Sequence, residues 1–289
     1  MKLSRLLATL ALLATLALSA CGEDDEAPTN EAASTPAAPS CDKADLELKT
    51  PGQLTVGTDK PAFPPYFEDD DPTNGNGFES AVAYGVAGEL GFEESEVKWT
   101  VVPFNASYKP GSKDFDFDIN QISITPERAE VVDFSDGYYE AAQAVIALKG
   151  TDGAAATSLA DLSDLRLGAQ TGTTSLTAIR DIIQPGEQPL VFKDTNAAKT
   201  ALQNDQVDAI LADLPTAFYI SAVEIPDSTI VGQFQPETGE QEEFGMLFEK
   251  GSELVPCVND ALATLREDGT LEQLEQQWLS DVVDVPELQ

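Results

Sequence analysis

Hydrophobic and polar residues alternate along this chain in patterns that predict strands and helices in turn. Residues 53–59, QLTVGTD, and residues 97–104, VKWTVVPF, have the short apolar pattern of buried strands. Between them, Phe78, Val82 and Val86 fall on one helical face, and Gly91 follows that helix as a stop signal. The folded part of the chain is therefore predicted to begin with a strand, a helix and a strand.

The alternation continues toward the C-terminal part of the chain. Strands are predicted in 142–150 and 244–251. Residues 165–183 are predicted to form a strand, a glycine turn and a helix, and residues 195–220 a helix, a strand and a helix. Two helices broken at Gly269 are predicted in 252–279. Residues 114–125, DFDFDINQISIT, lose phase at Asn120 and Gln121, which predicts a bulge or a strand end. Repeated β-α-β units predict an α/β fold with open, mainly parallel sheets, and the length suggests two such units.

Residues 1–44 have a different composition from the rest. Lys2 and Arg5 precede an apolar run, 6–18, that is too short to span a bilayer comfortably, and LSAC follows at 18–21. This order resembles a bacterial lipoprotein signal, in which residues 1–20 are removed and Cys21 is lipidated; an ordinary secretory signal with a chance cysteine is the alternative. Residues 21–44, rich in Ala, Pro and acids, are predicted to be a disordered tether.

Charge and residue counts exclude several classes of function. The net charge of −35, from 51 acidic and 16 basic residues, argues against nucleic acid and anionic membrane surfaces as partners. The chain has no histidine, so Ser-His-Asp and Cys-His catalysis and histidine-ligated zinc or haem are excluded. No cofactor or metal site is expected, because three cysteines cannot build a four-cysteine zinc site and the acidic stretch 68–77 lacks EF-hand spacing.

Two cysteines, Cys41 and Cys257, lie in the predicted folded region. Outside the cytoplasm such a pair favours a disulfide, which would fix the start of the domain to its C-terminal helices. Two free buried cysteines are the alternative.

Candidate binding residues lie where strands end, because ligands of open α/β sheets bind beyond the carboxyl ends of the strands. Asp59 ends one predicted strand. In residues 123–128, SITPER, Thr125 suits a helix N-cap and Pro126 the first helical turn, and Ser123 adds a hydroxyl. Arg128 would then lie where an anion is favoured, with a planar fork able to bind a carboxylate through two hydrogen bonds. A surface ion pair between Arg128 and a neighbouring acid is the alternative.

Two further strand ends carry polar residues. Thr173 and Thr174, in the turn GAQTGTTS, can donate hydrogen bonds to a ligand, although the turn lacks the phosphate-loop lysine and plain N-capping explains it equally. Asp213 ends the strand of DAILADLP and could hold an ammonium or cap the next helix.

In this order, the segments resemble the amino-acid-type (family 3) extracellular solute-binding proteins of ABC importers. The resemblance covers about residues 50–280 and rests on six stretches: GQLTVGTDKPAFPPYF, GFESAVAYGVAGELGF, ITPERAEVVDFSDGYYEAAQAVIALK, GAQTGTTS, QVDAILADLPTAFY and FGMLFEKGSELVPCVNDALATLREDGTLEQLEQQW. It implies a periplasmic-binding-protein-like type II fold, with two α/β lobes joined by two crossing strands near 145–148 and 244–248. Lobe 1 would comprise 45–145 and 245–289, and lobe 2 would comprise 146–244, with the ligand in the cleft between them.

The resemblance also implies roles for individual residues. Arg128, with Ser123 and Thr174, would bind the α-carboxylate of the ligand, and Asp213 its α-ammonium. Other residues expected at the ligand are Phe63 and Phe104 as apolar walls, Asp59 toward the ligand side chain, Thr173 beside Thr174, and Gln121, where many members have a small residue.

The implied function is that of a monomeric, lipid-anchored receptor on the outer face of the bacterial cell membrane. It would capture an amino acid or similar zwitterion and deliver it to an ABC permease with its ATPase, without catalysis. An enzyme of the dehydratase type on the same fold, with Glu79 or Asp59 as its acid, is one alternative. A ligand sensor for a signalling partner is the other.

Overall fold

The computed structural model describes residues 40–235, 241–279 and 285–289. The predictions of a signal peptide, of Cys21 lipidation and of the tether as far as residue 39 lie outside these residues. The predicted end of the tether at residue 44 is wrong, because Cys41 forms a disulfide with Cys257 and Lys43 an ion pair with Glu96. The chain from residue 39 onward forms one compact unit. Within the described ranges, no helix combines the length and the apolar character needed to cross a membrane.

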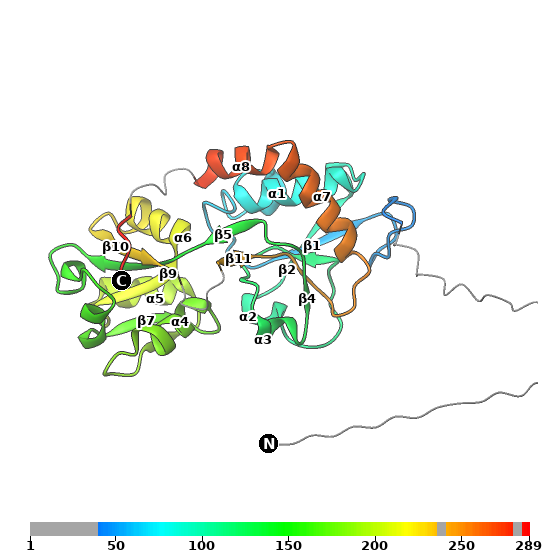
Figure 1. Ribbon diagram of the computed structural model, residues 1–289. Coiled ribbons are helices and arrows are strands. Elements are labelled where there is room, and N and C mark those ends of the chain that lie inside the picture. Colours follow the sequence, from blue (N-terminus) through cyan, green and yellow to red (C-terminus); the bar gives the residue numbers. More distant parts are fainter. Residues whose placement is uncertain (1–39, 236–240, 280–284) are drawn as a thin grey trace, which may run out of the picture. The chain divides into compact units, whose positions relative to one another are not determined.

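Within the described residues, the first sheet has five strands in the order β2-β1-β3-β12-β4. Figure 1 labels β1, β2 and β4 of this sheet. β1 pairs in parallel with β2 and β3, whereas β12 runs antiparallel to β3 and β4. The strands are β1 (Leu54–Thr58), β2 (Val97–Val101), β3 (Phe117–Asp118), β4 (Asp133–Phe134) and β12 (Leu247–Phe248). The loss of alternation at Asn120 therefore marks a strand end, since β3 stops two residues earlier.

Three long helices pack together beside the first sheet: α1 (Phe78–Glu89), α7 (Val255–Glu267) and α8 (Thr270–Leu279). The predicted apolar face of α1 is buried, with Phe78, Val82 and Val86 fully inaccessible to solvent in the core of this lobe. Gly269 lies between α7 and α8 in the left-handed backbone region, which confirms the predicted break. This sheet and these helices are lobe 1.

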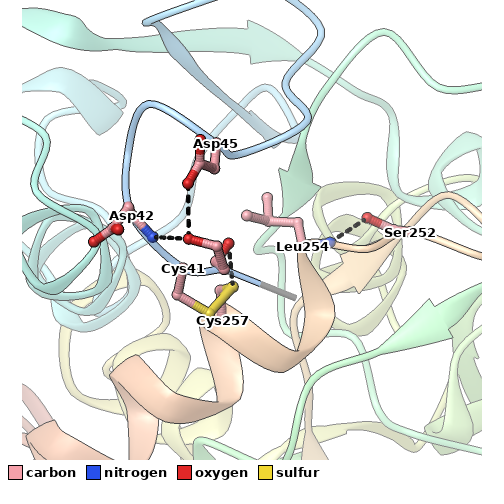
Figure 2. The surroundings of a disulfide bond; sticks show 7 residues. Cys41, Asp42, Asp45, Ser252, Leu254 and Cys257 are labelled. Carbon is pink, nitrogen blue, oxygen red and sulfur yellow. Dashed lines mark hydrogen bonds between the residues drawn. A yellow bond between two sulfur atoms is a disulfide. The ribbon is translucent and has the colours of Figure 1, made fainter. Parts of the chain in front are cut away.

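A disulfide joins Cys41 to Cys257 in α7, across 216 residues of sequence (Figure 2). Cys257 is buried in the core of lobe 1, and Cys41 packs against the same core. The predicted pairing is confirmed, and it fixes the beginning of the folded chain to a C-terminal helix of the same lobe.

A second five-stranded sheet, counted over the described ranges, has the order β10-β6-β9-β7-β8. Its strands are β6 (Gln143–Leu148), β7 (Leu167–Gln170), β8 (Leu190–Phe192), β9 (Ala209–Asp213) and β10 (Ser228–Phe234). β6 is apolar on both faces: Val145 and Ala147 enter one core cluster, whereas Ala144 and Ile146 enter the other. This sheet and the helices on its faces are lobe 2.

The three predicted helices of lobe 2 are present, each after a strand, although the strand β8 was not predicted. They are α4 (Thr174–Ala178) after β7, α5 (Thr195–Gln203) after β8 and α6 (Leu214–Tyr219) after β9. α4 and α6 each continue into a turn of π-helix, Ile179–Ile183 and Ile220–Glu224 respectively. The α/β fold with two lobes is therefore confirmed. The expectation of mainly parallel sheets is wrong, because each five-stranded sheet has two parallel and two antiparallel pairings among the described residues.

The lobes are connected by a short antiparallel pair, β5 (Tyr139–Ala141) and β11 (Glu242–Phe244). The expected first crossing near residues 145–148 is wrong, because those residues lie inside β6 and pair with β9 and β10. The C-terminal residues also depart from the expected lobe 1. Glu287 bridges Gln233 of β10, and Leu288 is buried in a core cluster of lobe 2.

Candidate functional site

A cavity lies between the two lobes and is lined by eight of the nine predicted binding residues. We call it the interlobe cavity; its lining includes Asp59, Phe63, Phe104, Asn120, Gln121, Ser123, Gln170, Thr173, Thr174, Thr195, Lys199, Asp213, Tyr219 and Glu224. Residues more than 150 positions apart in the sequence thus face one space. Arg128, the ninth predicted residue, lies behind this lining and borders a neighbouring hollow that shares Thr173 and Thr174.

Asp59 fixes the aromatic wall of lobe 1. Its Oδ2 accepts a hydrogen bond from the Phe104 backbone N–H (3.1 Å), and its Oδ1 accepts one from the Lys60 N–H (2.6 Å). Phe104 begins the short helix α2 (Phe104–Ser107), whose start is thereby tied to the end of β1. Asp59 therefore positions Phe104 at the cavity as well as lining it.

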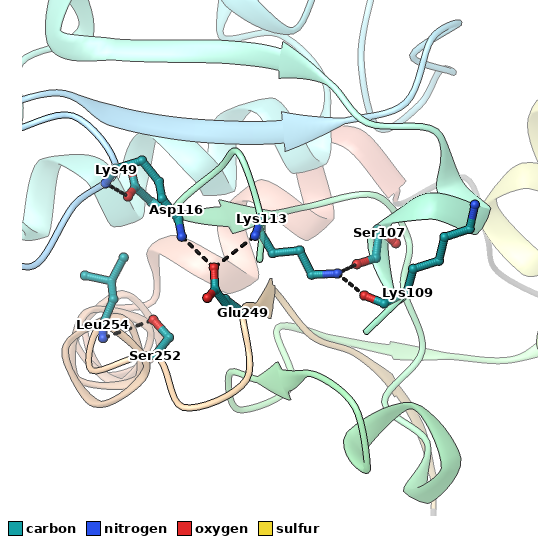
Figure 3. A network of polar contacts seen from close by, with 8 residues as sticks. All are labelled: Lys49, Ser107, Lys109, Lys113, Asp116, Glu249, Ser252 and Leu254. Carbon is teal, nitrogen blue, oxygen red and sulfur yellow. Dashed lines mark hydrogen bonds and ion pairs between the residues drawn. The ribbon is translucent and has the colours of Figure 1, made fainter. Parts of the chain in front are cut away.

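A polar network holds the segment that follows α2 (Figure 3). Glu249 Oε2 accepts hydrogen bonds from Lys49 Nζ (2.6 Å) and from the Lys113 N–H (2.9 Å). The buried Lys113 Nζ donates to the carbonyls of Ser107, at 2.6 Å, and of Lys109. This network connects the chain after α2 to the end of β12. The helix that carries Phe104 is therefore held at its start by Asp59 and at its end by Lys113.

Gln121 has a left-handed backbone conformation with φ 49°. Non-glycine residues rarely adopt this conformation unless other contacts hold it. Here the buried Glu79 accepts hydrogen bonds from the Gln121 N–H (2.7 Å) and from its side-chain amide. Burial raises the pKa of Glu79 to about 7, against the lowering effect of hydrogen bonds from Tyr138 and Gln121. Glu79 thus supports the cavity floor without lining the cavity.

Arg128 is buried, not a surface residue. Thr125 caps its helix, α3 (Pro126–Ala129), by accepting from the Arg128 N–H (3.2 Å), as predicted. The guanidinium donates to the carbonyls of Ser123 (2.6 Å) and Gly172 (2.9 Å) and lies over the Phe104 and Tyr108 rings. Across the described part of the chain, no acid forms an ion pair with Arg128, which contradicts the surface-pair alternative.

The lobes approach most closely around Gly172 and Thr174. The hydroxyls of Ser123 and Thr174 face each other across the lobes at 3.3 Å. Gly172 has φ 77°, and a Cβ there would lie 2.2 Å from Asn105 Oδ1 and 2.3 Å from Tyr108 Oη. Glycine is therefore the residue that fits at this contact. The N-capping alternative is confirmed for Thr173, because its hydroxyl caps α4 by accepting a hydrogen bond from the Leu176 N–H.

Asp213 lies at the cavity wall and forms no side-chain cap on α6, which contradicts the capping alternative. Its Oδ1 accepts from Gln143 Nε2 (2.9 Å), and the same nitrogen contacts Glu242 Oε2 at 2.9 Å. Burial raises the pKa of Asp213 to about 8, and the nearby Glu242 charge adds to this effect; the hydrogen bond from Gln143 and the Arg128 charge oppose it. Two acids and one guanidinium therefore share the region behind the Ser123–Thr174 contact.

Several polar residues of this region were not predicted from the sequence. Gln143 is fully buried, and its amide oxygen accepts from Ser175 Oγ (2.6 Å), which leaves its nitrogen pointing at the two acids. Glu242 Oε1 and Asn120 Nδ2 are buried without a hydrogen-bond partner among the described residues. A polar residue inside the apolar stretch AQAVIALKG was the available signal for Gln143, whereas no local pattern indicates Glu242.

The geometry is that of a receptor for a small charged molecule held between two lobes, and sequence comparison agrees. The sequence profile of the bacterial extracellular solute-binding proteins, family 3, matches residues 54–281. The chain belongs to this family. As a family 3 solute-binding protein it is an extracytoplasmic protein.

Two named relatives are binding proteins. The L-cystine-binding protein TcyJ of Escherichia coli (strain K12) is 30% identical over 235 residues, covering 80% of this chain and 84% of that protein. The ABC transporter glutamine-binding protein GlnH of Bacillus subtilis (strain 168) is 28% identical over 214 residues, covering 73% and 76%.

Solved structures show the same fold. An ancestral arginine-binding protein bound to arginine is similar, with a TM-score of 0.66 and 32% identity over 79% of this chain and 98% of that one. The ancestral amino acid-binding protein AncCDT-1, a precursor of cyclohexadienyl dehydratase, has a TM-score of 0.65 and 29% identity over 78% and 95%. The type II two-lobed fold implied by the sequence is thus confirmed for this solute-binding protein.

Proposed function

We propose that this protein captures an amino acid or similar small zwitterion and delivers it to an ABC permease. The observation that carries the proposal is the interlobe cavity, which has Asp213 in its wall and Arg128 directly behind the Ser123–Thr174 contact. An acid suits an ammonium, and an arginine fork suits a carboxylate. The named relatives bind cystine and glutamine, so an amino-acid ligand agrees with the chemistry of the cavity.

The ligand carboxylate would enter between the hydroxyls of Ser123 and Thr174. By separating them it would reach the guanidinium of Arg128, whose present acceptors are two backbone carbonyls. The ammonium would meet Asp213, and Phe63 and Phe104 would exclude water from the ligand. Closure of the lobes around these contacts is the step that a permease would recognise.

The protein is proposed to be a monomeric lipoprotein anchored through Cys21, with a permease and its ATPase as partners. We propose no catalytic role. The dehydratase alternative required an acid in the cavity, either Glu79 or Asp59. Glu79 lies outside the cavity lining, where Tyr138 and Gln121 occupy its oxygens. Asp59 lines the cavity, but each of its oxygens accepts a backbone hydrogen bond, from Lys60 and from Phe104. A prephenate or arogenate dehydratase assay tests this point, and turnover by the purified protein would overturn it.

Thermal denaturation in the presence of single amino acids tests the proposed function. A ligand at 100 times its dissociation constant should stabilise the protein by about 2.7 kcal/mol, which for a chain of this size raises Tm by roughly 5–10 °C. The panel contains the common amino acids and L-cystine, with maltose and divalent metal salts as controls. A shift produced by a sugar or a metal but by no zwitterion would contradict the proposal.

Binding is expected to depend on pH because Asp213 must lose its proton before it can hold an ammonium. With a pKa of about 8 in the free protein, Asp213 is mostly neutral at pH 6 and becomes charged as the pH rises through 8. Affinity for the tightest-binding amino acid should therefore rise by about tenfold to hundredfold between pH 6 and 8. Calorimetry at four pH values measures this rise.

Two variants identify the group responsible for the pH dependence. Asp213→Asn should bind weakly at every pH, with a flat profile. Glu242→Gln should shift the rise in affinity to lower pH, because the Glu242 charge contributes to the raised pKa of Asp213. A profile that is flat in the wild-type protein would contradict the raised pKa of Asp213, and wild-type affinity in Asp213→Asn would exclude Asp213 as the ammonium ligand.

A further inference from the structure

Lys199 and Glu224 form a second pair of opposite charges within the lining of the interlobe cavity. Lys199 Nζ donates to both carboxylate oxygens of Glu224, at 2.6 and 2.7 Å. Lys199 is only 7% exposed, in a chain with 51 acids and 16 basic residues. Its ammonium also lies over the Phe63 ring of lobe 1, 5.4 Å from the ring centre, so the pair borders both lobes.

This ion pair has unused binding capacity. A lysine ammonium has three N–H donors, and the described residues accept only two hydrogen bonds from Lys199. Each oxygen of Glu224 accepts one hydrogen bond from Lys199 and has further lone-pair positions. The side chain of Lys199 is 9% exposed and that of Glu224 is 30% exposed, so the pair is open to the cavity on the Glu224 side. A partly exposed ion pair contributes little to stability, so stability alone gives no reason for this pair to line a ligand cavity.

The position of the pair indicates a long ligand. Asp213 directly precedes α6, and Glu224 ends the π-helical turn that continues it. Ten residues of helix separate their backbones by roughly 15 Å, and the long side chains of Lys199 and Glu224 shorten that gap. An acid and a base thus occur at two separated places: Asp213 with Arg128, and Glu224 with Lys199.

We infer that Lys199 and Glu224 bind a second amino-acid head group, so that the preferred ligand is an elongated molecule with a carboxylate and an ammonium at both ends. Its second carboxylate accepts from Lys199, and its second ammonium donates to Glu224. A single zwitterionic head matches two adjacent opposite charges, whereas an acidic or a basic side chain matches only one of them. The inference rests on the proposed function, because the first head group is held by Arg128 and Asp213.

Two ligands that differ only in the second head group test this inference. L-cystathionine carries an amino-acid group at both ends of a thioether, and S-ethyl-L-cysteine is the same molecule with the second group removed. Calorimetry on the full-length protein should give an affinity for L-cystathionine at least about thirtyfold higher. L-glutamate and L-arginine, which satisfy only Lys199 or only Glu224, should bind no more tightly than S-ethyl-L-cysteine within about threefold.

The double variant Lys199→Met/Glu224→Gln removes both charges together and leaves no unpaired buried ion. In this variant the preference for L-cystathionine should fall below about threefold. The control Lys43→Met/Glu96→Gln removes a lysine–glutamate ion pair from lobe 1, away from the cavity, and should keep the preference. Thermal melting confirms that each variant is folded.

The outcomes separate this inference from the proposed function. A wild-type preference below about threefold, or a preference that the double variant retains, overturns the second head-group site. L-glutamate or L-arginine binding as tightly as L-cystathionine overturns it as well, whether or not the double variant folds. If no amino acid of any kind binds, the proposed function itself fails.

Discussion

Replacing Arg128 with alanine is expected to weaken amino-acid binding by at least about thirtyfold, or about 2 kcal/mol. The guanidinium of Arg128 donates to the Ser123 and Gly172 carbonyls beside the contact between Ser123 and Thr174, and its planar fork suits a ligand carboxylate. Calorimetry with the amino acid that gives the largest thermal shift measures the loss.

Two further substitutions show which property of Arg128 matters. Arg128→Lys keeps the charge but loses the planar fork, so its affinity for the amino acid should lie between the affinities of the wild type and of the alanine variant. Arg166→Ala is the matched control, because Arg166 is an exposed arginine of lobe 2 that pairs with Asp208 at 2.6 Å, outside the cavity. An Arg128→Ala affinity within about threefold of the wild type would mean that Arg128 only fixes backbone carbonyls.

Loss of the disulfide is expected to cost about 2–5 kcal/mol of stability. The bond between Cys41 and Cys257 closes a loop of 216 residues, which is the range where restriction of the unfolded chain has its largest effect. Urea unfolding should therefore give a lower free energy of unfolding for Cys41→Ser/Cys257→Ser than for the parent. Both proteins carry Cys21→Ser, so that no third thiol can exchange.

A reducing agent supplies the control for this prediction. It should lower the stability of the parent to that of the double variant and leave the double variant unchanged. Because both cysteines belong to lobe 1, ligand affinity at a temperature where both proteins are folded should change little. Equal stability of the parent and the double variant in non-reducing buffer would contradict the prediction.

The order of the elements was predictable because the signals for it are local. Periodicity alone indicates the helix Phe78–Glu89 and the strands after it, since the apolar positions of a helix or strand depend only on its own repeat. The helix start at Thr125 and Pro126 is local in the same sense. The first connecting strand was predicted too late in the chain because a single residue separates β5 from β6, so no turn signal marks where the crossing ends.

The lobe that a residue joins is decided by distant partners. Residues 143–148 belong to lobe 2 because β9 and β10 pair with them on both edges, and neither strand is adjacent in the sequence. Leu288, near the C-terminus, is also placed by contacts with distant residues, since its side chain is buried in a core cluster of lobe 2. No local pattern contains that information.

The α/β class, the disulfide partners and eight residues of the interlobe cavity lining were predictable from the amino-acid sequence. The fold class follows from local periodicity and the disulfide from the number of cysteines. The rule that ligands bind at strand ends indicates Asp59, Ser123, Thr173, Thr174 and Asp213. Phe63, Phe104 and Gln121 were expected only from the family resemblance. The position of Gln143 between Asp213 and Glu242, 70 and 99 residues away, and the pairing of Lys199 with Glu224 depend on the folded arrangement of the chain. Charges act through space over a few ångströms, so their effects depend on which residues the fold brings together.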